Sequence, residues 1–130
     1  MDLSGRPAHV VRCVIVDDNV SFQVAAQALL EGEGVPVVGV ASNAAEALDT
    51  VAHLRPDVVL VDATLGRESG FNLARRLAAA DPPVPVIMIS TRSEADLAEL
   101  LQDAPVLGFV PKSQLSAREV HRLVSERPDR

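Results

Sequence analysis

Five short apolar segments, each followed by a stretch of helical pattern, constrain the fold of this chain more than any other feature. The apolar segments are residues 10–16, 35–41, 57–62, 86–90 and 106–110. Runs such as VVRCVIV and VIMIS are nearly continuous in Val, Ile and other apolar residues, which is typical of strands buried on both faces. Continuous strands that alternate with helices predict an α/β fold, in which helices cover both faces of a parallel sheet.

The stretches between and after these strands predict five helices. In the first, apolar residues at positions 20, 24, 25, 28 and 29 have helical spacing, so we expect them to face the sheet. The second has an apolar stripe of Ala44, Leu48 and Val51, and the others are expected over about 71–80, 94–103 and 117–126. Capping patterns precede three of the five: Asn43 with Glu46, Ser93 with Asp96, and Ser116 with Glu119.

Composition narrows the class of protein. The chain has 130 residues, and apolar residues make up 48% of it, enough for one domain with an aliphatic core. The net charge of −6 argues against direct nucleic-acid binding, which needs clustered Lys and Arg. We find no apolar run long enough to span a membrane and no signal peptide. The single cysteine, Cys13, cannot form an internal disulfide, so a reducing cytoplasm is the expected location.

We therefore expect one domain over residues 10–126, between an N-terminal tail (1–9) and a C-terminal tail (127–130). Polar side chains follow four of its five strands at the point where each strand ends. Asp17 and Asp18 follow the first strand, Asp62 ends the third, Ser90 ends the fourth and Lys112 follows the fifth. Ligands of open parallel sheets bind beyond the carboxyl ends of the strands, so these side chains are expected to share one crevice.

Three carboxylates in one crevice repel each other and need a compensating cation. One candidate is Lys112, the single lysine of a chain with eleven arginines. The other is Mg²⁺, which prefers oxygen ligands such as Asp17, Asp18, Asp62 and the backbone carbonyl of Thr64. With both cations present, Asp62 becomes a plausible nucleophile toward phosphorus, since the equatorial oxygens could be neutralised by Mg²⁺, Lys112 and the Ser90 hydroxyl.

Four stretches in this order match a known family: VIVDDN, VVLVDATLGRESG, VIMIS and GFVPKSQL. With them the chain resembles the receiver domain of two-component response regulators over about residues 10–126. The resemblance implies a flavodoxin-like, doubly wound five-stranded parallel sheet with strand order 2-1-3-4-5 and five helices.

The resemblance also implies a function. A partner histidine kinase would phosphorylate Asp62 in a Mg²⁺-dependent reaction, Ser90 would move to meet the phosphoryl group, and Phe109 would swing inward as the switch aromatic. The surface of about residues 93–126 would then change and bind a downstream protein or an appended effector domain. Such a domain is a phosphorelay signalling protein that catalyses only its own phosphorylation and dephosphorylation.

Two alternatives stay open at this point. A Mg²⁺-dependent phosphohydrolase with an Asp nucleophile usually has a second carboxylate two residues later, where this chain has Thr64. A degenerate receiver acting as an unphosphorylated interaction module would be expected to lack at least one of the acidic residues, Ser90 or Lys112. Neither the cognate kinase nor the stimulus follows from the sequence, and the chain could be a stand-alone receiver or a domain cut from a longer regulator.

A homodimer through the fourth helix, fifth strand and fifth helix is also possible from the charges. Glu94, Asp96 and Glu99 could meet Arg118 and Arg122 of a second copy. Pairs within one chain, or solvated side chains, are equally compatible with the pattern, and exposed ion pairs stabilise little.

Overall fold

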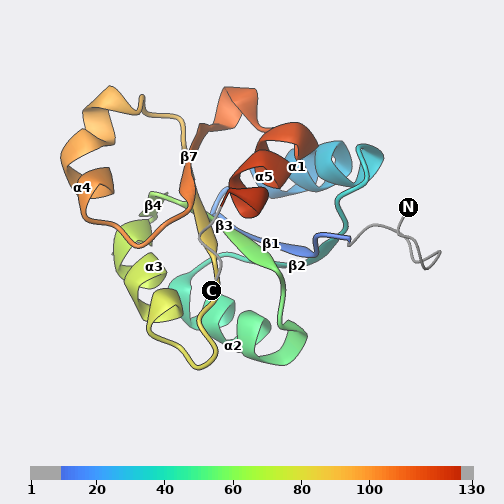
Figure 1. The fold of residues 1–130 in the computed structure, drawn as a ribbon, viewed down its shortest axis with the longest axis horizontal. Helices are drawn as coiled ribbons and strands as arrows, with labels where there is room; N and C mark the ends of the chain where they lie inside the picture. Colours follow the sequence, from blue (N-terminus) through green and yellow to red (C-terminus); the bar gives the residue numbers. More distant parts are fainter. Residues whose placement is uncertain (1–9, 127–130) are drawn as a thin grey trace.

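The computed structural model describes residues 10–126, so the predicted tails at 1–9 and 127–130 lie outside the described residues. A five-stranded parallel sheet forms the centre of the molecule (Figure 1). Its strands are β1 (Cys13–Val16), β2 (Val37–Ala41), β3 (Val58–Asp62), β6 (Val86–Ser90) and β7 (Gly108–Pro111). Their spatial order, β2-β1-β3-β6-β7, is the order 2-1-3-4-5 that the resemblance implies, in a flavodoxin-like fold.

The labels of the last two strands are shifted because the stretch after Asp62 is a hairpin rather than the open loop expected from the sequence. Strands β4 (Thr64–Leu65) and β5 (Glu68–Ser69) pair antiparallel. Gly66, the first residue of the two-residue turn between them, has a φ of 59°, a conformation that glycine adopts without strain. The hairpin therefore turns tightly beside the end of β3.

Helices cover both faces of the sheet (Figure 1). They are α1 (Val20–Gly32), α2 (Ala44–Leu54), α3 (Gly70–Ala78), α4 (Ala98–Gln102) and α5 (Ala117–Ser125). Alternate residues of each strand divide the core between the two faces: Val14 and Val16 of β1 pack with α2 and α3, whereas Cys13 and Ile15 pack with α1 and α5. Among the described residues, no helix is both long and apolar enough to cross a membrane.

The fourth helix is shorter than the ten residues expected. It consists of a 3₁₀ turn over Ala95–Leu97 followed by α4, although the Ser93 hydroxyl accepts the predicted capping hydrogen bond from the amide of Asp96. Leu97 is buried, but Leu100 is 54% exposed. With so small an apolar face on the core, tertiary packing stabilises only a short helix here.

The predicted face of α1 is wrong. Val20 and Val24, which the spacing placed against the sheet, are each 63% exposed, and the buried residues of the helix are Gln23, Ala26 and Leu30. The side-chain amide of Gln23 donates to the backbone carbonyl of Asp17 and to Ser42 Oγ. A buried amide needs such partners, so its hydrogen bonds help to decide the orientation of the helix.

At the amino ends of the strands, Arg12 and Asp57 join three elements. The carboxylate of Asp57 accepts from the backbone amide of Arg12 at 2.8 Å, and the Asp57 amide donates to the Arg12 carbonyl. The Arg12 guanidinium donates to the carbonyls of Leu54 and Arg55 at the end of α2. The first strand begins at Cys13 rather than at residue 10. Strands β2, β3 and β7 also begin one or two residues later than predicted.

Candidate functional site

The five polar residues predicted to share a crevice all lie at the carboxyl edge of the sheet. Asp17 and Asp18 directly follow β1, Asp62 ends β3, Ser90 ends β6 and Lys112 directly follows β7. Strands β1 and β3 are paired neighbours in register, so the residues after β1 lie beside the end of β3. Parallel pairing thus assembles residues that are far apart in the sequence.

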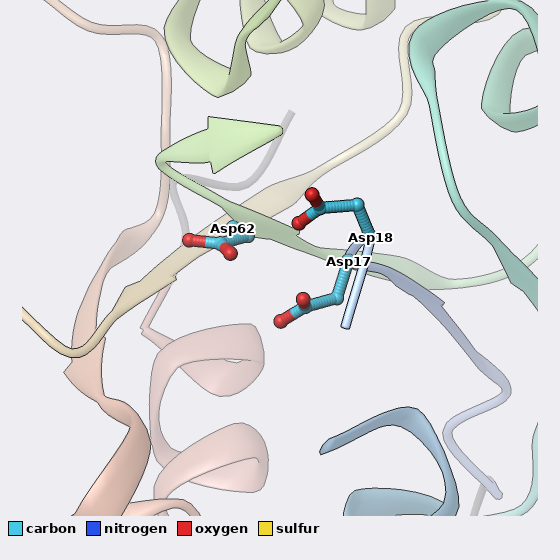
Figure 2. Close-up of side chains that lie close together, drawn as sticks. All are labelled: Asp17, Asp18 and Asp62. Carbon is cyan, nitrogen blue, oxygen red and sulfur yellow. The ribbon is translucent and has the colours of Figure 1, made fainter. Parts of the chain in front are cut away.

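Three carboxylates form the centre of this edge, those of Asp17, Asp18 and Asp62 (Figure 2). One oxygen atom of each lies within 4.8 Å of the others. Asp17 and Asp62 are buried, while Asp18 is exposed to solvent. Two unit charges about 4 Å apart repel each other by roughly 4 kcal/mol at an effective dielectric constant near 20, so the cluster requires a cation.

Asp17 has one oxygen in a hydrogen bond and one without. Its Oδ1 accepts from the backbone amide of Asn19 at 2.8 Å, and Asn19 caps α1. Its Oδ2 is buried and accepts no hydrogen bond, although Lys112 Nζ lies 2.6 Å away in an ion pair. The short ion pair lacks hydrogen-bond geometry, so the charge of Lys112 is what compensates this buried oxygen.

Lys112 is shared between two carboxylates. Its Nζ donates to Asp62 Oδ2 at 3.2 Å, the contact that the sequence predicted, and also lies beside Asp17. Burial acts to lower the pKa of Lys112, but the close contacts and negative charges of Asp17 and Asp62 outweigh it, and the pKa is raised. The ammonium is therefore charged at neutral pH, and it is the one cation paired with this cluster among the described residues.

Asp62 is held in an acidic and largely buried environment. Its pKa is raised above the ordinary carboxyl value, first by burial and then by the negative charge of Asp17. A hydrogen bond from the backbone amide of Thr64, 3.2 Å from Oδ1, and the Lys112 ammonium act in the opposite direction. One ammonium does not fully compensate two buried carboxylates, so the crevice favours a further cation.

Comparison with known proteins identifies the family. Residues 13–124 match the family model of the response regulator receiver domain. The chain belongs to this family. This confirms the resemblance drawn from the four sequence motifs, and the match spans the whole five-stranded sheet and the five helices except the last residue of α5.

Curated relatives are longer than this receiver domain. A protein-glutamate methylesterase/protein-glutamine glutaminase of Methanosarcina mazei is 30% identical over 93% of this chain and 34% of its own length. One of Myxococcus xanthus is 35% identical over 84% of this chain and 32% of its own length. A putative transcriptional regulator of Pseudomonas aeruginosa is 29% identical over 79% of this chain and 50% of its own length. The chain thus spans between a third and a half of these relatives.

Solved structures are similar over nearly the whole chain. The signal receiver domain of the putative response regulator NarL from Mycobacterium tuberculosis has a TM-score of 0.80 at 28% identity, covering 92% of this chain and 100% of that one. The response regulator domain of Thermotoga maritima CheB has a TM-score of 0.76 at 21% identity, with 92% and 100% covered, and shows the shared fold.

The acidic edge of the receiver domain has the donors that a hard divalent cation needs. The three carboxylates supply oxygen ligands, and the buried Asp17 Oδ2 meets the Lys112 ammonium in an ion pair without hydrogen-bond geometry. Thr64, whose carbonyl was predicted as a further ligand, lies in β4 next to Asp62 and donates its amide to that carboxylate. Its carbonyl as a ligand stays a prediction.

Ser90 ends β6 at the acidic edge, and Phe109 lies in β7 three residues before Lys112. The buried Ser90 hydroxyl oxygen accepts from the backbone amide of Arg92 at 2.9 Å, which leaves the hydroxyl proton free to donate. Phe109 lies within β7, beside Met88 of β6, and is half-buried against the core on the α2 and α3 face. The predicted inward swing of Phe109 stays a prediction.

The sequence patterns did not indicate two residues that support the site. Phe22 places its ring 4.4 Å from Lys112 Nζ, and Gln23 holds the backbone carbonyl of Asp17. Both lie in the first turn of α1, behind its cap at Asn19. The signal that could have found them is their place three and four residues after a cap that adjoins the acidic pair.

Proposed function

We propose that this receiver domain accepts a phosphoryl group on Asp62 from a phosphohistidine of a sensor kinase, in a reaction that requires Mg²⁺. The observation that carries the proposal is Lys112, whose ammonium lies 3.2 Å from one oxygen of Asp62 and 2.6 Å from Asp17. A buried carboxylate beside a charged ammonium and two further carboxylates is suited to attack phosphorus, because the negative phosphoryl group meets cations rather than bare carboxylates.

The transfer is an in-line displacement. An Asp62 oxygen forms the bond to phosphorus, the bond from phosphorus to the imidazole nitrogen breaks, and its electron pair stays on the imidazole. A bound Mg²⁺, held by Asp17, Asp18, Asp62 and the Thr64 carbonyl, would neutralise charge on the phosphoryl oxygens. Lys112 stabilises a second oxygen, and the Ser90 hydroxyl can donate a hydrogen bond to a third.

The phosphorylated crevice then biases the neighbouring surface. The new charge-assisted bonds to Ser90 and Lys112 would act at the ends of β6 and β7, next to α4 and α5. We infer that the surface of about residues 93–126 is the one that changes, with Phe109 as the switch aromatic. A downstream protein or an appended effector domain would read that change, and a cytoplasmic location would suit it.

The dimer predicted from the charges has weaker support. The Arg122 guanidinium already lies 2.7 Å from Glu119 and 3.5 Å from Glu126 of its own helix. An ion pair with α4 of a second copy would have to replace these contacts. Such exposed exchanges contribute little, so we expect dimerisation, if phosphorylation induces it, to depend on more than this arginine.

A direct test separates the three candidate functions. The protein and the variant Asp62→Asn are incubated with Mg²⁺ and either acetyl phosphate or phosphoramidate, and with beryllofluoride, and intact mass and NMR spectra are recorded. We expect one phosphoryl adduct per chain and beryllofluoride-induced shifts in the wild type alone. Turnover of phosphate monoesters would instead identify a hydrolase, and absence of adduct and shifts with every reagent would identify an interaction module.

A further inference from the structure

An aromatic ring lies against the one ammonium of the site. Lys112 Nζ is 4.4 Å from the centroid of the Phe22 ring, within the range of a cation–π interaction. The ring is half-buried and packs on the core beneath α1 and α5. The Lys112 side chain is 12% exposed, so its ammonium meets the ring in a partly desolvated place, where such contacts are strongest.

The ring is placed by the same turn that places Asp17. Asp17 Oδ1 accepts from the amide of Asn19, and Asn19 Oδ1 accepts from the amide of Phe22 at 3.0 Å. Lys112 contacts both ends of this chain of hydrogen bonds, since its Nζ lies 4.4 Å from the Phe22 ring centroid and 2.6 Å from Asp17 Oδ2. The position of the ring relative to the ammonium is therefore built into the start of α1.

We propose that Phe22 is a positioning residue for Lys112, and thereby for phosphoryl transfer to Asp62. A lysine side chain has several rotatable bonds, and its ordering is costly unless the ammonium has fixed partners. Its carboxylate partners, Asp17 and Asp62, are also the groups needed by a cation and by phosphorus. The Phe22 ring does not take part in binding the cation or the phosphoryl group. It can therefore keep the Lys112 ammonium in the crevice while the carboxylates bind those groups.

Other aromatic side chains do not share this position. The chain has three Phe and no Tyr or Trp. Phe71 is buried in the core on the α2 and α3 face, and Phe109 packs on that same face. Phe71→Leu is therefore a matched control, since it removes an aromatic ring from the core without touching Lys112.

The first test needs neither metal nor phosphate. Because Lys112 is the single lysine of the chain, a protein labelled with ¹³C-lysine gives one ε-methylene signal. We expect ring-current displacement of its protons in the wild type, in Phe22→Tyr and in Phe71→Leu, and its loss in Phe22→Leu. An unchanged signal in Phe22→Leu would overturn the contact between the ring and the lysine. The positioning role is tested by ¹³C relaxation of the same ε-methylene, whose order should fall in Phe22→Leu and not in Phe71→Leu, and equal order in both would overturn it.

The second test rests on the proposed function. With Mg²⁺ and a small phosphodonor, Phe22→Leu should accept phosphate about threefold to tenfold more slowly than the wild type, and Phe22→Tyr should restore most of the rate. Equal rates in Phe22→Leu and wild type would overturn the role in transfer. If the wild type itself took no phosphate, the proposed function and this rate effect would both fall, and the lysine signal would still decide whether Phe22 positions Lys112.

Discussion

Strand β3 follows one aspartate and ends on another, and the two differ in almost every respect. Asp57, just before the strand, bonds to the backbone of Arg12, and the Arg12 guanidinium in turn bonds to two carbonyls at the end of α2. Asp62, at the end of the strand, has a side-chain cation as partner and two further carboxylates beside it. The amino edge uses charge to join backbone segments, whereas the carboxyl edge keeps charges that the fold does not compensate.

The comparison teaches which charged residues to read as structural. Arg12 presents a planar fork of donors, and helix-end carbonyls are suitable acceptors for it. Lys112 presents a compact ammonium that can pass from one oxygen to another. Arg12 thus holds backbone segments together, whereas Lys112 lies among charged side chains at the candidate site.

The largest effect is expected from Gly70→Ala. Gly70 lies at the carboxyl edge, but we expect it to matter for the stability of the fold. A Cβ on Gly70 would lie 1.9 Å from the backbone carbonyl oxygen of Asp62, so the start of α3 and the end of β3 would have to separate. We expect the free energy of unfolding to fall by about 2–4 kcal/mol, with phosphorylation impaired as well. Urea unfolding measures the loss.

Gly32→Ala serves as the control for this substitution, because a Cβ there would meet nothing within 4 Å. Gly32 is also helical, so its replacement should leave stability unchanged or slightly higher. Equal stabilities of the two variants would show that the close approach at Gly70 relaxes at no cost.

Arg12→Ala tests the amino edge. Losing the guanidinium leaves the carbonyls of Leu54 and Arg55 without these donors, at a cost of about 1–3 kcal/mol in unfolding free energy. The rate of phosphorylation should not change, since the candidate site lies at the opposite edge of the sheet. Arg76→Ala, at an exposed arginine of α3, is the control and should alter stability by no more than about 0.5 kcal/mol.

The same substitution at the two ends of β3 should have opposite effects in the metal-free protein. Asp57→Asn weakens the charge-assisted bond to Arg12 and should lower the melting temperature. Asp62→Asn removes a carboxylate whose pKa is raised by burial and by Asp17, so this variant should have a slightly higher melting temperature. Thermal melts in a chelating buffer at neutral pH measure both, and a lower melting temperature for both variants would contradict the comparison.

The pH dependence follows from the same pKa. A raised pKa means that folded Asp62 binds its proton more tightly than the unfolded chain does, so stability falls as pH rises from the ordinary carboxyl value through the raised one. Asp62→Asn should flatten that part of the profile, and Asp57→Asn should retain it.

The smallest effect concerns the single thiol. Cys13 is fully buried in β1, and burial raises its pKa to about 12, so a thiol reagent at neutral pH should modify it only through unfolding. Modification should therefore be faster in Gly70→Ala and Arg12→Ala, and no faster in Asp62→Asn. Rapid modification of the wild type would show local opening of β1.

Most of the sheet and the acidic edge could be predicted from the sequence, because they depend on local patterns. Continuous apolar runs mark the central strands, and parallel pairing brings their carboxyl ends together whatever the details of the helices. The proximity of Asp17, Asp18, Asp62 and Lys112 follows from topology alone. The roles of Ser90, Thr64 and Phe109 depend on states of the site beyond this one, and remain predictions.

The orientation of α1 could not be predicted in this way. Apolar spacing favoured the face of Val20 and Val24, but Gln23 and Phe22 take the inner positions. The end of β1 offers Gln23 a carbonyl, and the residue after β7 offers Phe22 an ammonium. Those partners come from residues 17 and 112, and no local pattern contains them. Helix α5, in contrast, buries Ala117, Val120 and Leu123, three residues apart along one face.

The shortage of positive charge around Asp62 leads us to expect that the stability of the folded protein depends on the cations in solution. A cation that binds the folded crevice, and not the unfolded chain, adds a free energy set by its concentration relative to its dissociation constant. If the proposed Mg²⁺ site is correct, the melting temperature of this protein should rise with the divalent-ion concentration.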